Sequence, residues 1–231
     1  MEKRPKQTLA RTLKCATFFA KIVLISALFI PAFFAFKQFS GQAKKPAAAT
    51  TVKIVEGAER PRSKELVKIY SIVKSHRPDI NDSEAWSVAE VILGESAKRK
   101  LDPLLVLALI RVESDFQYAV VSPSGARGLM QIMPDTGKFL SEVLGRESNL
   151  RPVAFRPESL DDPHFNIRLG TYYLHDLKKQ FQDLTLTLTA YNFGPVEIQN
   201  RLDNNLEFPS DFASLVLDAY ERYKKARQPT F

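Results

Sequence analysis

The sequence is poor in the residues that form disulfides and metal sites. Cys15 is the only cysteine, so it has no partner within the chain. The three histidines, His76, His164 and His175, are widely separated and share no spacing typical of metal ligands. We therefore predict no internal disulfide, no metal site and no other cofactor.

The larger part of the chain also lacks an excess of positive charge. The whole sequence has a formal net charge of +7, which by itself would suggest a nucleic-acid partner. Residues 1–58 carry a net charge of +8, however, and residues 59–231 carry −1. The basicity therefore belongs to the N-terminal segment, and we predict no nucleic-acid binding.

The N-terminal segment has the pattern of a membrane-targeting sequence. Residues 1–14 are polar and basic, and residues 15–36 are apolar except for Lys21, which gives a run long enough to span a bilayer. Counted from Ile22 the run has the length of a signal-peptide core instead, so a transmembrane anchor and a cleaved signal are both open. Positive charge before the run predicts a cytoplasmic N-terminus.

Both alternatives export the rest of the chain. We predict a single-pass inner-membrane protein with its folded domain in the periplasm, or a secreted periplasmic protein if the segment is cleaved. Residues 37–62 are small, polar and basic without periodicity, which indicates a flexible linker. Residues 63–231 are then left to form the folded domain.

This domain has a helical pattern almost throughout. Apolar residues recur at helical spacing, and the pairs Asn81…Glu84, Asp102-Pro103 and Asp162-Pro163 have the composition of helix starts. Residues 146–160 are polar and contain proline, which indicates a loop. The fold class that we expect is all-α.

The alternation of leucine and threonine in residues 184–189 is the exception. A period of two and β-branched residues favour a strand by propensity. A lone strand among helices would have no partner, so we predict a buried helix whose threonine hydroxyls bond back to the preceding turn.

Glu113 closes an almost entirely apolar run that begins at Leu104. Desolvation disfavours the charged form of a carboxyl group, so an acid in this place is expected to have a raised pKa. Such a group can act as a general acid at neutral pH. A solvated acid that only caps the helix is the simpler alternative for Glu113 taken alone.

Three short motifs follow one another in the domain: Glu113-Ser114, Gly128-Leu129-Met130-Gln131 and Ala190-Tyr191-Asn192. Their types and order resemble the Slt-type lytic transglycosylases, the bacterial relatives of goose-type lysozyme. The resemblance covers roughly residues 95–225 and includes the helix that begins at Asp162-Pro163.

The resemblance implies a lysozyme-like helical domain that cleaves the β-1,4 bond between N-acetylmuramic acid and N-acetylglucosamine in peptidoglycan. Glu113 matches the family's single catalytic acid/base. It would protonate the glycosidic oxygen and then accept the proton of the muramyl 6-hydroxyl, which attacks the anomeric carbon. The product would be a 1,6-anhydromuramyl end formed without water.

The resemblance also assigns the other motif residues. Ser122 and Ser124 match positions that bind the acetamido and hydroxyl groups of the sugar. Gly128 would let the backbone pass close to the glycan, and Met130 and Gln131 would line the cleft beside Glu113. Two further positions complete the substrate-binding set, Tyr191 near the catalytic carboxyl and Asn192 as a structural or glycan-binding residue.

A single acid agrees with the neighbourhood of Glu113 in the sequence. Most glycosidases use two carboxylates, and the nearest companion, Asp115, lies two positions on along a helix and so points elsewhere. A second carboxylate from a distant segment is left open. If none exists, the acetamido group of the substrate has to stabilise the oxocarbenium ion.

Two other functions share the expected fold. One is a true hydrolase of the lysozyme kind, which differs only in what attacks the anomeric carbon. The other is a weakly active glycan-binding scaffold of an envelope-spanning complex, which the intact Glu113 disfavours.

The sequence also departs from the family pattern at Phe193, where a small residue is common.

Overall fold

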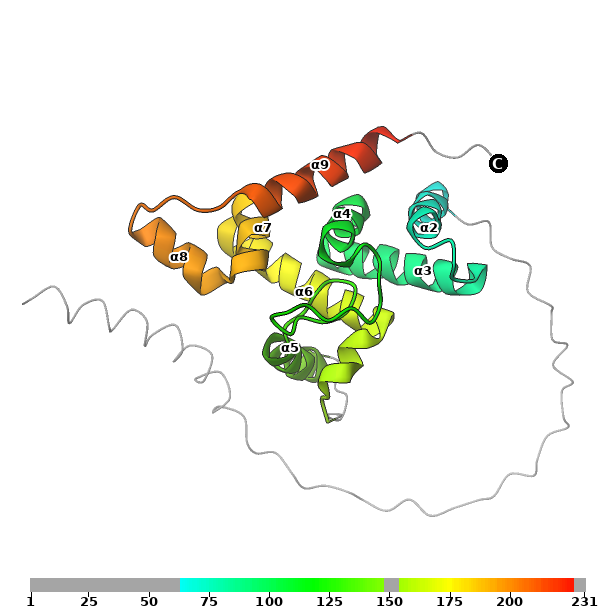
Figure 1. The fold of residues 1–231 in the computed structure, drawn as a ribbon, viewed down its shortest axis with the longest axis horizontal. Coiled ribbons are helices and arrows are strands. Elements are labelled where there is room, and N and C mark those ends of the chain that lie inside the picture. Colours follow the sequence, from blue (N-terminus) through cyan, green and yellow to red (C-terminus); the bar gives the residue numbers. More distant parts are fainter. Residues whose placement is uncertain (1–62, 148–153, 227–231) are drawn as a thin grey trace, which may run out of the picture. The chain divides into compact units, whose positions relative to one another are not determined.

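The computed structural model describes residues 63–147 and 154–226, and in this part the chain is helical (Figure 1). The predicted all-α class is confirmed for these residues, which hold only isolated β-bridges besides helices and turns. The elements are α2 (Lys64–His76), α3 (Asp82–Arg99), α4 (Pro103–Ser114), α5 (Pro134–Glu147), the 3-10 helix η1 (Pro157–Asp161), α6 (Pro163–Phe181), α7 (Leu184–Phe193), α8 (Pro195–Asp203) and α9 (Asp211–Lys225).

The basic tail, the apolar segment and the linker expected in residues 1–62 lie outside the described residues. Among the residues that are described, no helix is both long and apolar enough to cross a membrane. The expected membrane segment therefore stays a prediction.

Side-chain caps start the helices where the sequence predicts them. Asn81 accepts a hydrogen bond from the backbone N–H of Glu84 at 2.8 Å, and Asp102 accepts one from Leu104 at 2.8 Å. Asp162 caps α6 in the same way. Each such cap contributes about 1 kcal/mol to helix stability, and the cap at Asp102 fixes the start of α4.

Helix α4 lies in the middle of the domain, between α2, α3 and α9 (Figure 1). Every residue from Leu105 to Ile110 is buried, so the helix is enclosed on all sides over this stretch. Helix α3, which contacts α4, also packs against α6, and α6 in turn contacts α5, η1 and α7. A buried, capped helix gives a rigid support for the residues at its C-terminal end.

The leucine–threonine segment is a helix, α7, as predicted. The hydroxyl groups of Thr187 and Thr189 donate hydrogen bonds to the carbonyls of Asp183 and Thr185, four residues earlier. Asp183 caps the N-terminus through Leu186 at 2.7 Å. Tertiary burial and these bonds override the strand propensity of the segment.

Two predicted boundaries are corrected. Helix α5 continues to Glu147 and so includes the first two residues of the segment 146–160 that we expected to be a loop. The predicted loop of residues 146–160 contains the start of η1, because Pro157 begins a short 3-10 turn that buries Leu160.

Candidate active site

Glu113 lies in the last turn of α4 and is partly exposed. Burial by its surroundings raises the pKa of its carboxyl group to about 8. The partial negative charge at a helix C-terminus acts in the same direction, because it also disfavours a carboxylate. At neutral pH Glu113 is therefore a neutral acid with a proton to donate, as the sequence led us to expect.

Asp115 does not supply a second carboxylate to Glu113. Its carboxylate forms an ion pair with Arg111 at 2.6 Å and contacts the His76 ring at 3.2 Å. Within the described residues, no charged neighbour contributes to the pKa shift of Glu113. The site thus presents one protonated carboxyl group.

Ser114 joins helix α4 to the loop of the second motif. Its hydroxyl group donates to the backbone carbonyl of Leu129 at 2.8 Å and lies 3.3 Å from that of Ile110. The conformation of residues 128–131 is therefore tied directly to the residue that follows Glu113. This role of Ser114 explains why a small hydroxyl residue stands beside the acid.

Ser122 forms the turn that precedes this loop. Its Oγ accepts a hydrogen bond from the N–H of Ala126 at 3.0 Å, and its own N–H donates to the carbonyl of Ala126 at 2.9 Å. The hydroxyl proton of Ser122 is not used by these bonds. Ser124 is exposed in the same turn.

Asn166 in α6 holds the loop from the other side. Its side chain is fully buried; Oδ1 accepts from the N–H of Met130 at 2.7 Å, and Nδ2 donates to the carbonyls of Arg127 and Leu160, each at 2.9 Å. One amide thus satisfies three backbone groups. Arg127 is anchored further by Asp161, which it meets through two nitrogens at 3.1 and 2.6 Å.

Gly128 is required by this packing. Its φ is +78°, and a Cβ atom at this position would collide with the Leu160 carbonyl and the Asn166 amide. We expected the backbone at Gly128 to pass close to the glycan. In the structure this backbone lies close to the Leu160 carbonyl and the Asn166 side chain. The glycine allows the loop to lie directly against η1 and α6.

The side chains of Met130 and Gln131 both contact other residues of the domain. The Met130 side chain is 0% exposed and packs against Gly170, so the expectation that it lines the cleft is replaced by a packing role. Gln131 adopts a left-handed backbone with φ 47°, and its amide donates to the carbonyls of Val120 and Gly128 at 3.1 and 2.9 Å. Its side chain is partly exposed.

Tyr191 contacts the second motif through its hydroxyl group. The phenol donates to the backbone carbonyl of Met130 at 2.9 Å, and only 8% of the residue is exposed. Because a hydroxyl group has one proton, this bond replaces donation to Glu113. Burial raises the pKa of Tyr191 well above its ordinary value, and Glu113 adds to the rise, which places the two groups within electrostatic range.

The two residues that follow Tyr191 lie at the surface, whereas Ala190 before it is buried. Asn192 is exposed, and Phe193 at the end of α7 is 45% exposed. The bulky ring at position 193, which departs from the family pattern, therefore presents apolar surface next to Asn192.

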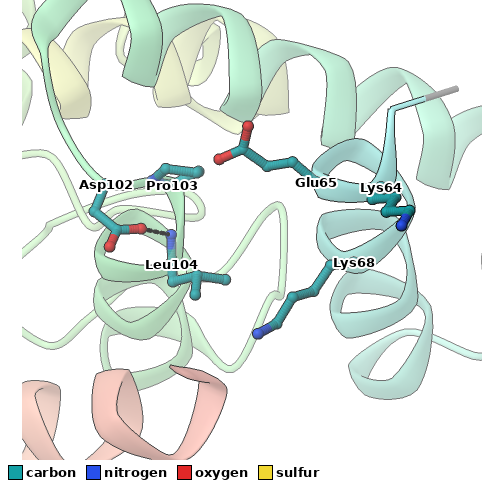
Figure 2. A pocket seen from close by; sticks show the side chains of 6 residues that line it. All are labelled: Lys64, Glu65, Lys68, Asp102, Pro103 and Leu104. Atoms are coloured by element: carbon teal, nitrogen blue, oxygen red, sulfur yellow. Dashed lines mark hydrogen bonds between the residues drawn. The ribbon is translucent and has the colours of Figure 1, made fainter. Parts of the chain in front are cut away.

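A separate hollow lies at the opposite end of α4. It has a volume of about 550 Å³ and is lined by Lys64, Glu65, Lys68, Asp102, Pro103 and Leu104 (Figure 2). Figure 2 shows these residues on the first turns of α2 and α4. Glu113 is ten residues further along the helix, about 15 Å away at 1.5 Å per residue, so this hollow is not part of the candidate site.

The sequence reasoning missed Asn166, Asp161 and the structural role of Ser114. One signal could have indicated Asn166. It is a polar residue on the buried side of an amphipathic helix, close to the buried Ile167 and Leu169. Nothing in its spacing indicated which backbone groups it would bond. The structure brings the three motifs together, since Ser114 and Tyr191 both bind carbonyls of the second motif.

Comparison with known proteins identifies the matching families and folds. A family model described as a transglycosylase SLT domain matches residues 90–211, slightly more than half of the chain. The soluble lytic murein transglycosylase of Escherichia coli K12 is 37% identical over 100 residues, which are 43% of this chain and 15% of that protein. A membrane-bound lytic murein transglycosylase C from Shigella sonnei is 32% identical over 153 residues, 62% of this chain and 41% of that protein.

The fold is also similar to that of a solved structure. The 70 kDa soluble lytic transglycosylase of Escherichia coli matches with a TM-score of 0.53 and 24% identity, over 74% of this chain and 32% of that one. The chain therefore spans less than half the length of each of these proteins. Because the family model covers more than half of the chain and all three motifs, this chain belongs to the transglycosylase SLT domain family.

Proposed function

We propose that this protein is a peptidoglycan lytic transglycosylase in which Glu113 is the single acid/base. The observation that carries the proposal is a carboxyl group whose pKa is raised to about 8 by burial, at the junction of the three family motifs. The names of the relatives, lytic murein transglycosylases, support murein as the substrate.

In the proposed reaction Glu113 first donates its proton to the oxygen of the β-1,4 bond between N-acetylmuramic acid and N-acetylglucosamine. The C–O bond breaks as an oxocarbenium ion forms, and the N-acetylglucosamine chain leaves as an alcohol. The Glu113 carboxylate then takes the proton of the muramyl 6-hydroxyl. The oxygen of that hydroxyl bonds to the anomeric carbon and closes the 1,6-anhydro ring.

A single carboxyl group suits this sequence of steps. The Glu113 carboxyl group is protonated again at the end of each turnover, and the reaction consumes no water. Since the Asp115 carboxylate is bound by Arg111 and His76, the acetamido group of the substrate is the group that would stabilise the oxocarbenium ion.

The glycan would lie across the face formed by Glu113, the Ser122–Ser124 turn and the end of α7. The free hydroxyl proton of Ser122, the exposed Ser124 and the exposed Asn192 are the groups that we assign to sugar binding, with Gln131 beside them. The exposed ring of Phe193 adds an apolar surface on which a sugar face can pack.

We further propose that the N-terminal segment carries this domain to the periplasm, as an inner-membrane anchor or a cleaved signal. The name of the Shigella sonnei relative, a membrane-bound enzyme, supports attachment of this chain to the membrane.

A lysozyme-type hydrolase is the alternative function on the same site. The products decide between them, because a hydrolase gives reducing muramyl ends and a transglycosylase gives anhydro ends.

The experiment that tests the proposal is turnover of purified peptidoglycan by the full chain and by Glu113→Gln. The amide keeps the shape of the side chain but cannot donate the proton. We expect the parent to release anhydromuramyl fragments and the variant to release none. Equal release by a folded Glu113→Gln protein would refute the assignment of Glu113.

A further inference from the structure

Helix α4 ends at Ser114 and is followed by two residues with left-handed backbone. Asp115 has φ 49° and Phe116 has φ 62°, and neither is glycine. Left-handed backbone is uncommon for residues with a side chain and least favourable for bulky ones such as phenylalanine. A turn of this kind persists only where surrounding contacts hold it.

Besides the ion pair between Arg111 of α4 and Asp115, two residues at the end of α2 hold this turn. The His76 Nδ1 atom lies 3.2 Å from the Asp115 carboxylate, and the His76 ring stacks on the Phe116 ring with centroids 4.7 Å apart and planes at 14°. Arg77 donates from Nη1 to the Phe116 carbonyl at 2.9 Å. We call His76 and Arg77 the α2 clamp.

Arg77 is itself fixed in place. Its guanidinium group binds Asp79 through two nitrogens at 2.8 Å each, and it lies over the Tyr118 ring at 4.5 Å from the centroid. A bidentate pair of this kind has a defined orientation. The third nitrogen is thereby aimed at the Phe116 carbonyl.

His76 is fixed by α9. Its Nε2 atom lies 2.8 Å from the Tyr223 hydroxyl group. Burial and Arg111 lower the pKa of His76, against a smaller opposing effect of Asp115, so the ring is neutral at pH 7. A neutral imidazole that donates from Nδ1 to Asp115 and accepts at Nε2 from Tyr223 satisfies both partners.

The clamp lies outside the part of the chain that the family model matches. Helix α2 precedes residue 90, and Tyr223 follows residue 211. These flanking helices therefore meet at the end of the catalytic helix, two residues beyond Glu113. The three motifs by themselves do not contain His76, Arg77 or Tyr223.

We propose that His76 and Arg77 are positioning residues, which hold the Asp115–Phe116 turn and thereby keep the Glu113 carboxyl group in its buried place. Their effect on turnover rests on the proposed function, whereas their effect on the burial of Glu113 does not. Loss of the clamp lets the turn relax toward ordinary backbone angles, unwinds the last turn of α4 and gives Glu113 more water.

The test follows the Glu113 carboxyl group directly, by a ¹³C NMR pH titration of the full chain labelled at glutamate side-chain carboxyls. The signal of Glu113 is identified by its loss in Glu113→Gln. The variants are His76→Gln, Arg77→Lys and the double variant His76→Ala/Arg77→Ala. Lys74→Met is the matched control, because Lys74 lies at the same end of α2 but binds Ile80 and Asp82.

We expect the pKa of Glu113 to fall by about one unit or more in the double variant and by less in Arg77→Lys, whose ammonium group can still reach the Phe116 carbonyl. The value of kcat should fall roughly ten- to hundredfold with little change in KM, because geometry and not sugar binding is lost. Lys74→Met should lose thermal stability and keep both the Glu113 titration and kcat.

An unchanged Glu113 titration and kcat in folded clamp variants would overturn the proposal. If the double variant does not fold, the two single variants decide, measured below their own unfolding temperatures. A parent protein that does not cleave peptidoglycan, combined with a shifted Glu113 titration in the clamp variants, would overturn the proposed function and leave the clamp standing. Clamp variants that cleave peptidoglycan at the parent rate and show an unshifted Glu113 titration would overturn the clamp and leave the proposed function standing.

Discussion

The Tyr191 hydroxyl group donates a hydrogen bond to the Met130 backbone carbonyl across 2.9 Å, which joins α7 to the second motif beside Glu113. The bond fixes the position of the loop and takes up the one phenolic proton. The tyrosine therefore acts on the site through the backbone of its neighbour.

Tyr191→Phe should leave the Met130 carbonyl without its partner in a buried place. We expect a loss of about 1–2 kcal/mol in the free energy of unfolding and a fall in turnover that is much smaller than that of Glu113→Gln. Urea unfolding and turnover of purified peptidoglycan measure the two effects. Unchanged stability and rate together would show that the bond has no role in either.

Asn166→Ala should be the most damaging loss of a polar side chain in the site. It removes the hydrogen-bond partners that Asn166 gives to the N–H of Met130 and the carbonyl of Leu160, whereas the carbonyl of Arg127 keeps its bond from the N–H of Ile132. We expect a loss of about 3 kcal/mol in the free energy of unfolding. Asn204→Ala is the matched control, because Asn204 is exposed and bonds only within its own helix end. Similar unfolding midpoints for the two variants would contradict the role of Asn166.

Two glycine substitutions should have opposite signs. Gly128→Ala meets the Leu160 carbonyl and Asn166 at a positive φ, and we expect a loss of several kcal/mol through steric overlap and backbone strain. Gly145→Ala adds a methyl group to open space within α5, where alanine is favoured over glycine by about 0.5–1 kcal/mol. Thermal unfolding of both variants checks the signs, and a tolerated Gly128→Ala would mean that the loop can move away from η1.

The pH dependence of stability should reveal the raised pKa of Glu113. The folded protein holds this proton up to about pH 8, whereas the unfolded chain releases it near pH 4.5, the ordinary value for a glutamic acid. The folded state therefore binds more protons between these values, and its stability falls as the pH rises through this window. The loss is complete above the folded pKa.

Glu113→Gln removes this dependence. We expect the variant to be more stable than the parent by about 4 kcal/mol at pH 8 and nearly equal to it at pH 4.5. Thermal unfolding across this pH range measures the difference. A difference that is constant with pH would mean that Glu113 titrates with an ordinary pKa.

The same raised pKa predicts the basic limb of the rate profile. A general acid must be protonated to act, so kcat/KM should fall as the pH rises through about 8. Initial rates of glycan cleavage between pH 6 and pH 10 would show this limb, with pH values chosen so that the protein stays folded. A rate that rises through pH 8 would instead indicate that ionised Glu113 is the form that begins the reaction.

Much of the fold could be predicted because its signals are local. The Asn81 and Asp102 caps follow from residue type and position, and the buried helix before Glu113 follows from its apolar run. The helix at residues 184–189 required a further argument, that a lone strand would have no partner. The structure confirms the predicted helix and the predicted bonds of Thr187 and Thr189 to the preceding turn.

The contacts that assemble the site could not be predicted, because they join residues far apart in the sequence. Asn166 bonds to Met130 across 36 positions, and His76 bonds to Tyr223 across 147. Neither pair has a spacing that periodicity or propensity can detect. The partner of the Tyr191 hydroxyl was likewise decided by packing, since a nearby carboxyl and a nearby carbonyl are equally plausible from sequence.

Mass spectrometry of the fragments that the full chain releases from purified peptidoglycan, beside those released by Glu113→Gln, tests the central claim most directly. The account predicts 1,6-anhydromuramyl ends from the parent and no release from the folded variant. Reducing muramyl ends from the parent, or anhydro ends from the variant, would contradict it.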